Sequence, residues 1–243
     1  MINIDEKLID GTRLFGWKSE PPLTPVAPDY AHYILEKNIF SEEECNEWNE
    51  YLMEQESILF DKFRTSNYGV QNRERGTTIT SRHRDFNLLK LDFHGISKLK
   101  KALFEGIQTL LGVSGNTHWQ ETLYVNSWFN VLRQGDGMDI HLHGYNKNTF
   151  YGFHVTINAT QPSFTSYYHP VKFQEDAVHN PNKIGNMTIF PNFIPHEVSL
   201  NKYETPRITI AGDIMPSTWK DEVDGFDEFK KHLVELGTVG SSE

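Results

Sequence analysis

Cysteine is nearly absent from this chain, since Cys45 is the only one among its 243 residues. No internal disulfide and no cysteine-based zinc site can therefore form, which suits a reducing compartment. Long apolar runs are also missing, and none approaches the roughly 20 residues that a membrane-spanning helix needs. Residues 1–6 lack the basic and apolar regions of a secretory signal. These absences predict a cytoplasmic protein that does not enter a membrane.

Basic residues are in the minority, because 23 lysines and arginines stand against 33 acidic residues and give a formal net charge of −10. An acidic surface repels phosphate backbones, so nucleic acid is an unfavourable partner. One group of arginines is interpreted either as a salt-bridged surface or as a local positive patch for an anionic substrate. This group comprises Arg64, Arg73, Arg75, Arg82 and Arg84.

The N-terminal half reads as an arm followed by helices. Four prolines between residues 21 and 28 exclude a regular helix or a central strand there, and we expect residues 1–30 to be an irregular arm. The segment Ser41-Glu-Glu-Glu44 is a capping box that predicts the start of a helix. Apolar residues at helical spacing predict a second helix over residues 96–111.

From about residue 122 the pattern changes to short apolar runs separated by turns, which is typical of a sandwich or barrel of strands. After Pro216 we expect a last amphipathic helix with Leu233 and Leu236 on its inner face, followed by a frayed tail from Gly237. The runs that predict strands are residues 150–158, 163–168, 186–190, 197–200 and 207–213.

These patterns predict one domain over residues 1–243, mainly β with flanking helices. Its core would be a jelly roll of strands over residues 121–214. Residues 1–120 would form the N-terminal arm and helical support, and residues 215–243 the C-terminal helix and tail.

The most informative segment is Asp139-Ile-His141-Leu-His143. Histidines one residue apart lie on the same face of a strand, because side chains alternate with a period of two. A third histidine, His196, follows 53 residues later on another expected strand. Imidazole is a good ligand for iron, and two ligands from one strand end with a third from a neighbouring strand would form one face of a non-haem iron site.

Arg207 follows His196 by 11 residues and opens an apolar strand-like run. A planar guanidinium can hold a carboxylate through two hydrogen bonds, and Thr209 on the same strand face could donate another. A surface salt bridge between Arg207 and Glu204 is the simpler alternative. An iron site followed by an inward-facing arginine predicts Fe(II) with the acidic co-substrate 2-oxoglutarate.

The sequence then resembles a known family in two places. The first is Ser127-Trp-Phe-Asn130 with Gly135, His141-Leu-His143 and Gly152, and the second comprises residues 185–198 and 207–210. Both resemble the 2-oxoglutarate/iron(II) oxygenases of bacteriophages and marine bacteria, which are related to prolyl 4-hydroxylases, over roughly residues 120–214.

This resemblance implies a double-stranded β-helix with His141 and His196 as iron ligands and Arg207 as the anchor of 2-oxoglutarate. His143 occupies the place of the aspartate that the family usually has in its HxD motif. The chain also departs from the family at Gly144-Tyr145, where a proline is usual, and at Tyr151, where a small residue is usual.

The resulting prediction is an Fe(II)- and 2-oxoglutarate-dependent dioxygenase, a hydroxylase in the simplest case, that acts on a small molecule or a protein side chain. Tyr124 and Asn126 are candidate cofactor-binding residues, and Asn130 and Tyr151 are further candidate polar groups of the pocket. Neither the substrate nor the oligomeric state follows from the sequence.

Several alternatives stay open. Asp139 shares a strand face with His141 and could supply a carboxylate ligand instead of His143. Iron held by His141 and His196 alone would resemble an iron halogenase. The chain could also be a non-catalytic, cupin-like binding protein, or a nucleic-acid demethylase, which the acidic balance disfavours.

Overall fold

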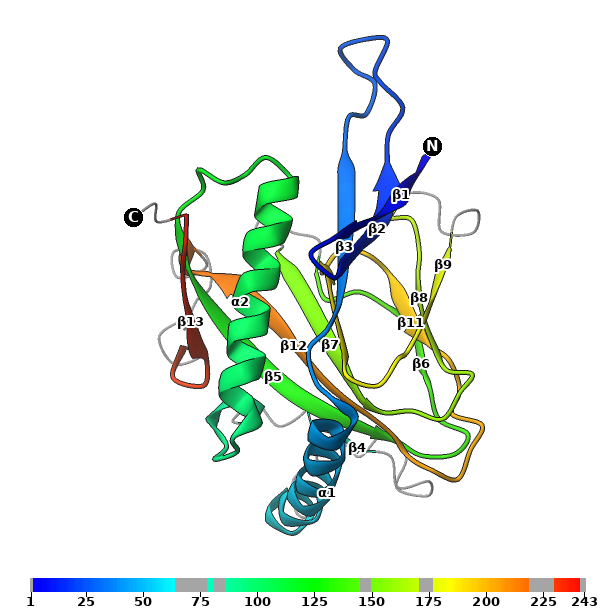
Figure 1. Ribbon diagram of the computed structural model, residues 1–243, viewed down its shortest axis with the longest axis vertical. Helices are drawn as coiled ribbons and strands as arrows, with labels where there is room; N and C mark the ends of the chain where they lie inside the picture. Colours follow the sequence, from blue (N-terminus) through cyan, green and yellow to red (C-terminus); the bar gives the residue numbers. More distant parts are fainter. Residues whose placement is uncertain are drawn as a thin grey trace.

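The computed structural model describes residues 2–63, 78–80, 86–144, 150–170, 177–218 and 230–240. The described strands form two antiparallel sheets (Figure 1). The large sheet has the order β1 (Ile2–Ile9), β2 (Thr12–Lys18), β3 (Ala31–Asn38), β10 (Asn186–Pro191), β7 (Tyr151–Asn158), β12 (Arg207–Pro216), β5 (Glu121–Leu132) and β13 (Val234–Val239), with β4 (Thr78–Ile79) also on β5. The small sheet has the order β6 (Met138–His141), β11 (His196–Val198), β8 (Phe164–Tyr167) and β9 (Val178–Pro181).

The eight strands from β5 to β12 are divided equally between the two sheets in the manner of a jelly roll. Strands β5, β7, β10 and β12 belong to the large sheet, while β6, β8, β9 and β11 belong to the small one. Such double-sheet closure is how a jelly roll manages the edges of its strands. The predicted double-stranded β-helix is therefore confirmed, with β1–β3 and β13 extending its large sheet.

Two helices cover the outer face of the large sheet, and the small sheet packs against the inner face. Helix α2 (Gly95–Val113) lies so close to β10 that a Cβ on Gly106 would meet the Ile189 side chain at 2.5 Å. On the inner face, Tyr167 of β8 packs against Phe190 of β10. Because side chains alternate along a strand, β10 contributes Ile189 to the helical core and Phe190 to the space between the sheets.

Helix α1 (Glu42–Phe63) begins with the predicted capping box. The Ser41 hydroxyl accepts a hydrogen bond from the Glu44 backbone N–H at 3.2 Å, and the Glu44 carboxylate accepts one from the Ser41 backbone N–H at 2.7 Å. These bonds satisfy donors that would otherwise have no partner within the helix. Cys45, Trp48 and Leu52, which recur at helical spacing, are buried.

Ser41→Ala should lower the free energy of unfolding by about 1 kcal/mol, because the helix loses its N-cap acceptor. Urea denaturation followed by circular dichroism would measure the loss. Ser57→Ala in the same helix is the matched control, since the Ser57 hydroxyl bonds only the Met53 carbonyl inside the helix. Equal destabilisation by both substitutions would contradict the capping role.

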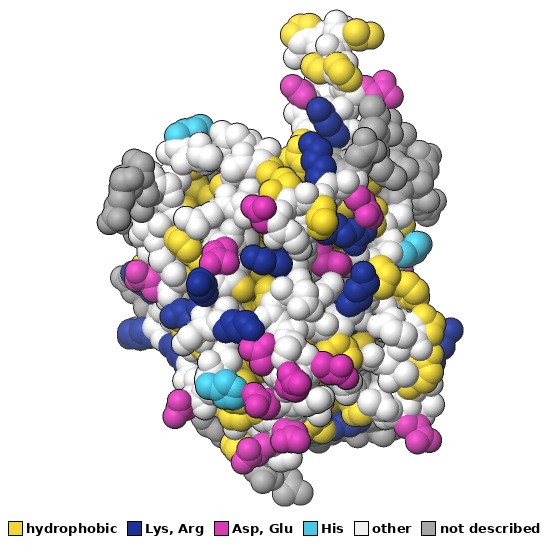
Figure 2. Space-filling view, in the orientation of Figure 1, with side chains coloured by type: hydrophobic (Ala, Val, Ile, Leu, Met, Phe, Trp, Pro, Cys, Tyr) yellow, Lys and Arg dark blue, Asp and Glu magenta, His cyan; other side chains and the backbone are white. Residues whose placement is uncertain are grey.

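The prediction of an irregular arm over residues 1–30 is wrong, because β1 and β2 form a hairpin. The turn is Asp10-Gly11, with φ values of 48° and 75°. Positive φ at both positions matches the right-handed twist of paired strands, which makes Asp-Gly a strong hairpin signal. The prolines are confined to the loop between β2 and β3, which projects from the molecule and exposes Leu23 and Val26 (Figure 2).

The prediction of a helix and a frayed tail at the C-terminus is wrong over residues 234–239. These residues form β13, which pairs with β5 at the end of the large sheet. Leu236 belongs to that strand, and its Gly237 neighbour has a φ of 139°. Pairing with an open strand edge overrides the weak helical spacing of the segment.

Residues 219–229, where the helix would have begun, and the arginine group at 64–84 lie outside the described residues.

The face of the large sheet that carries the helices is electrostatically mixed (Figure 2). Acidic and basic side chains alternate over it, and one exposed pair joins Lys98 to Glu44 at 2.5 Å. In the parts of the chain that the structure describes, neither helix is long and apolar enough to cross a membrane.

Candidate functional site

Three histidines meet where β6 and β11 lie side by side. His141 is the last residue of β6, His143 lies two residues beyond it, and His196 opens β11. Antiparallel pairing places His196 directly opposite His141. One ring nitrogen from each histidine lies within 4.8 Å of the others. The tertiary structure therefore brings together the three residues that the sequence pattern predicts as metal ligands.

All three imidazoles are oriented through the Nδ1 atom. His141 Nδ1 lies 2.7 Å from the Asp139 carbonyl oxygen, and His196 Nδ1 lies 3.1 Å from the carbonyl oxygen of Ile194. His143 Nδ1 lies 2.5 Å from Oδ1 of Asp213. Carbonyl and carboxylate oxygens can only accept, so each Nδ1 carries the proton. Each Nε2 then keeps a lone pair for a metal ion.

Burial favours the neutral form of two of these rings. Desolvation lowers the pKa of His141, although the Asp139 carbonyl opposes the shift. Desolvation also holds the pKa of His196 well below its usual value, and the adjacent His141 and His143 contribute in the same direction. A neutral imidazole is the form that binds a metal ion, so protons compete weakly for these two nitrogens.

The donor set fits a transition metal. Three neutral imidazole nitrogens suit iron, zinc, copper or nickel, whereas magnesium and calcium prefer oxygen. Among the described residues, the cluster that could hold an ion contains these three histidines and no carboxylate. The exposed Asp139 contributes its backbone carbonyl to His141 and lies outside the cluster of potential ligand atoms.

The histidines line a cavity of about 630 Å³ between the two sheets. One wall is the inward face of β12, where alternate residues of the strand point into the cavity. The intervening residues Ile208, Ile210 and Ile214 face the helical core. The wall residues from β12 are Arg207, Thr209, Ala211 and Asp213.

Arg207 is a buried cation without a counter-charge in the described part of the chain. Arg207 is 3% exposed, and its Nε and Nη1 atoms have no hydrogen-bond partner among the described residues. Burial lowers the pKa of Arg207 to about 10, so the guanidinium stays charged at neutral pH. The alternative salt bridge is not formed, since the described residues include no ion pair between Arg207 and the exposed Glu204.

A buried and unpaired charge costs several kcal/mol, so this arrangement calls for an anionic ligand. Arg133 provides the contrast within the same protein. Its two terminal nitrogens donate to both carboxylate oxygens of the buried Glu56, at 2.9 and 2.7 Å. Glu56 thus neutralises Arg133 within the protein, whereas the Arg207 guanidinium in the cavity is available to bind a ligand.

Polar groups beside Arg207 also have unused hydrogen-bonding capacity. Thr209 Oγ1 lies 3.4 Å from Asn130 Nδ2, while Asn130 Oδ1 has no hydrogen-bond partner among the residues that the structure describes. His154 is half-buried, and desolvation of its ring lowers its pKa to about 3 and keeps it neutral. Its Nε2 lies 2.7 Å from the Tyr167 hydroxyl, and its Nδ1 has no partner. These atoms could bind the same ligand as Arg207.

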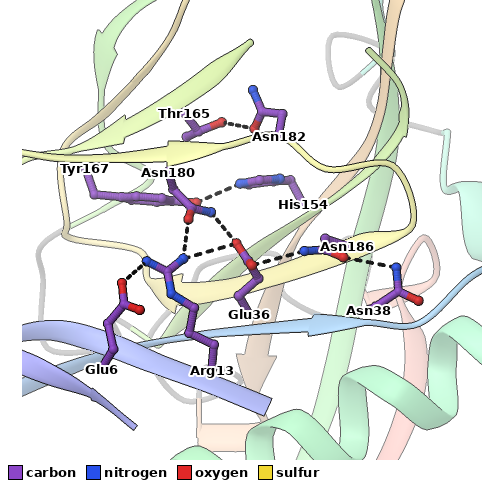
Figure 3. A network of polar contacts seen from close by, with 10 residues as sticks. All are labelled: Glu6, Arg13, Glu36, Asn38, His154, Thr165, Tyr167, Asn180, Asn182 and Asn186. Atoms are coloured by element: carbon purple, nitrogen blue, oxygen red, sulfur yellow. Dashed lines mark hydrogen bonds and ion pairs between the residues drawn. The ribbon is translucent and has the colours of Figure 1, made fainter. Parts of the chain in front are cut away.

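A polar network holds the two sheets together behind His154 (Figure 3). The buried Glu36 carboxylate of β3 accepts hydrogen bonds from Asn180 at 2.6 Å and Asn186 at 3.0 Å. Arg13 of β2 donates to the Asn180 side chain at 2.6 Å. The network therefore ties β9 of the small sheet to β2 and β3 of the large sheet.

The other predicted polar residues divide between two regions. Asn126 and Asn130 line the cavity of the histidines. Tyr124 does not line it, and its ring lies 4.7 Å from Lys230 Nζ instead. Tyr151 lines a separate aromatic cavity of about 530 Å³ together with Trp119 and Phe150. Tyr151 points away from the histidines because it neighbours Gly152, whose position faces His143.

Comparisons with known proteins identify similar solved structures only. No protein-family model matches the chain, and no curated protein matches its sequence. A 2OG-Fe(II) oxygenase family oxidoreductase from Burkholderia pseudomallei is 13% identical, with a TM-score of 0.35 over 46% of this chain and 57% of that one. This chain thus spans little more than half of that protein.

Two prolyl hydroxylases align over more of their length. A Pseudomonas putida prolyl-4-hydroxylase is 10% identical, with a TM-score of 0.48 over 76% of this chain and 92% of that chain. A prolyl hydroxylase from Trichoplax adhaerens, in complex with a hypoxia inducible factor peptide fragment, is 17% identical, with a TM-score of 0.47 over 75% and 82% of the two chains.

Proposed function

We propose that this chain is an Fe(II)- and 2-oxoglutarate-dependent oxygenase. The observation that carries the proposal is the buried, unpaired Arg207 in the same cavity as three convergent imidazoles. A metal centre alone would not require a desolvated cation beside it. A ligand with a metal-binding end and a distal carboxylate satisfies both features, and 2-oxoglutarate has this construction.

In this proposal His141, His143 and His196 hold the metal through Nε2. Arg207 would bind the distal carboxylate of 2-oxoglutarate, and the Thr209 hydroxyl would donate beside it. Bound Fe(II) and 2-oxoglutarate would, with dioxygen as the oxidant, supply oxidative decarboxylation to succinate and carbon dioxide coupled to oxidation of a substrate C–H bond. The low dielectric of the cavity strengthens the contact between Arg207 and the carboxylate.

Aromatic side chains keep the proposed site dry and its ligands in place. Phe190 is buried and packs edge-on against His196, with ring centroids 4.6 Å apart. Trp128 also lines the cavity, with its ring centroid 6.1 Å from that of His143. Hydroxylation of a small molecule or a protein side chain is the simplest outcome for such a site.

A visible spectrum recorded without oxygen would test the co-substrate. Protein with Fe(II) and 2-oxoglutarate should show a weak charge-transfer band at about 500 nm, where iron(II) chelated by a 2-oxo acid absorbs. Arg207→Gln should lose the band at 2-oxoglutarate concentrations that saturate the wild type, because the distal carboxylate loses its partner.

The matched control is Arg133→Gln, which removes a guanidinium that is bound to Glu56 outside the cavity. This variant should keep the band, with thermal unfolding measured to confirm that it is folded. Metal binding without a band in the wild type would refute the role of 2-oxoglutarate and favour a cupin-like metal-binding protein. A band that survives in Arg207→Gln would refute the role of Arg207.

A further inference from the structure

The histidine cluster lacks the carboxylate that such iron sites usually contain, yet a carboxylate lies directly behind one ligand. Asp213 Oδ1 is 2.5 Å from His143 Nδ1, on the opposite side of the ring from Nε2. We propose that Asp213 is a positioning residue that orients His143 and supplies negative charge to the metal centre through this ring. The proposal rests on the metal centre of the proposed function and is independent of 2-oxoglutarate.

The contact connects distant parts of the sequence. His143 follows the end of β6 in the small sheet, whereas Asp213 lies on β12 in the large sheet, 70 residues later. His141 and His196 are oriented by backbone carbonyls only two residues away from them. His143 is therefore the ligand whose orientation depends on packing between the sheets.

Gly152 provides the room for this contact. It pairs with Asp213 across β7 and β12, and a Cβ at this position would lie 3.2 Å from His143 Nδ1. The same Cβ would lie 3.1 Å from the Phe190 ring, which is fully buried and cannot move away easily. A side chain at position 152 would therefore press on the nitrogen that Asp213 binds.

The Asp213 carboxylate has no competing cation in the described residues. Its ion pair there is with His143, and no lysine or arginine joins it. The side chain is 28% exposed and lines the cavity. A carboxylate that accepts a hydrogen bond from Nδ1–H makes the other nitrogen of the ring a stronger donor to metal, and it fixes the tautomer. It also offsets part of the charge of a divalent ion held by three neutral ligands.

Substitutions at Asp213 separate its charge from its hydrogen bond. Asp213→Asn retains an oxygen acceptor but removes the charge, whereas Asp213→Ala removes both. Loss of a group that binds a metal-ligating histidine typically weakens metal binding about 10- to 100-fold. We expect the Kd for Mn(II), measured by calorimetry without 2-oxoglutarate, to rise about 10-fold in the first variant and toward about 100-fold in the second.

Asp139 offers the matched comparison, because it also stands beside a ligand histidine but contacts it through its backbone oxygen. Asp139→Asn should therefore bind Mn(II) as the wild type does. If this variant loses binding while Asp213→Asn keeps it, then Asp139 supplies the carboxylate and the proposal is wrong. Wild-type affinity in both Asp213 variants would also overturn it.

A double variant tests whether Asp213 acts through His143. Asp213→Ala should weaken Mn(II) binding no further in a His143→Ala background, because the ring that transmits its effect is gone. Additive losses would show that Asp213 contacts the metal independently, which would overturn a positioning role. Wild-type Mn(II) binding that depends on Asp213 but gives no 2-oxoglutarate band would sustain this inference while the co-substrate proposal failed.

Discussion

His196→Ala should remove high-affinity metal binding. His196 is 5% exposed and is oriented by the Ile194 carbonyl, and its ring centroid lies 4.3 Å from that of His141 and 5.1 Å from that of His143. Its loss removes one of three ligands, so the decrease in affinity should exceed the roughly 100-fold upper range seen when only a ligand's hydrogen-bond partner is removed. Titration calorimetry with Mn(II) would measure it.

The matched control is His179→Ala in β9 of the same small sheet. His179 Nδ1 lies 2.9 Å from the Ser166 hydroxyl, and this exposed residue is outside the histidine cluster. This variant should bind Mn(II) like the wild type. Circular dichroism of both variants would verify folding, and undiminished binding by folded His196→Ala would place the metal elsewhere and remove the basis of the proposed function.

Acid should destabilise the metal-free protein well before most carboxylates titrate. Burial lowers the pKa of His154 to about 3, whereas an unfolded imidazole has a pKa of about 6.5. The unfolded state therefore takes up a proton below about pH 6.5, and the folded state does not. The contribution of neutral His154 to the free energy of unfolding is therefore complete above about pH 6.5. It decreases progressively as the pH falls toward the pKa of His154 in the folded protein.

Through His154, the free energy of unfolding should decrease by about 1.4 kcal/mol between about pH 7.5 and about pH 5.5. His196, whose pKa is also held well below the usual value by desolvation, should contribute in the same direction. Urea unfolding at several pH values in the presence of a chelator would measure the slope.

His154→Gln should remove the His154 share of this slope, and His118→Gln is the control for loss of an exposed imidazole outside the cavity. An unchanged pH dependence in His154→Gln would mean that His154 is protonated in the folded protein. A cationic His154 would add a second positive charge beside Arg207, so the cavity would then favour a ligand with more negative charge.

Arg207 and Asp213 lie toward opposite ends of β12 and have different roles in the proposed site. Arg207 begins β12 and brings an uncompensated positive charge into the cavity. Asp213, six residues later on the same face, brings a negative charge to the metal-binding end. Because β12 pairs along its length with β5 and β7, both groups are held by a central and rigid element of the large sheet.

Local sequence patterns predicted much of this site. The HxH pair and the Arg207-x-Thr209 pair each depend on a period of two, which holds wherever a strand forms. The capping box of α1 depends on contacts within four residues. The Asp10-Gly11 turn is an equally local signal, but the four prolines that follow it favoured an irregular arm over a hairpin.

The amino-acid sequence by itself determined which residues share a face, where α1 begins, and which histidines and arginine could do chemistry, because these features follow from short-range geometry. Only the tertiary structure decided that His154 enters the cavity, that Tyr124 does not, and that Asp213 meets His143. It also left Arg207 without a partner in the described residues and added β13 to the sheet edge. These outcomes depend on strand register and sheet packing across tens of residues, which no local pattern specifies.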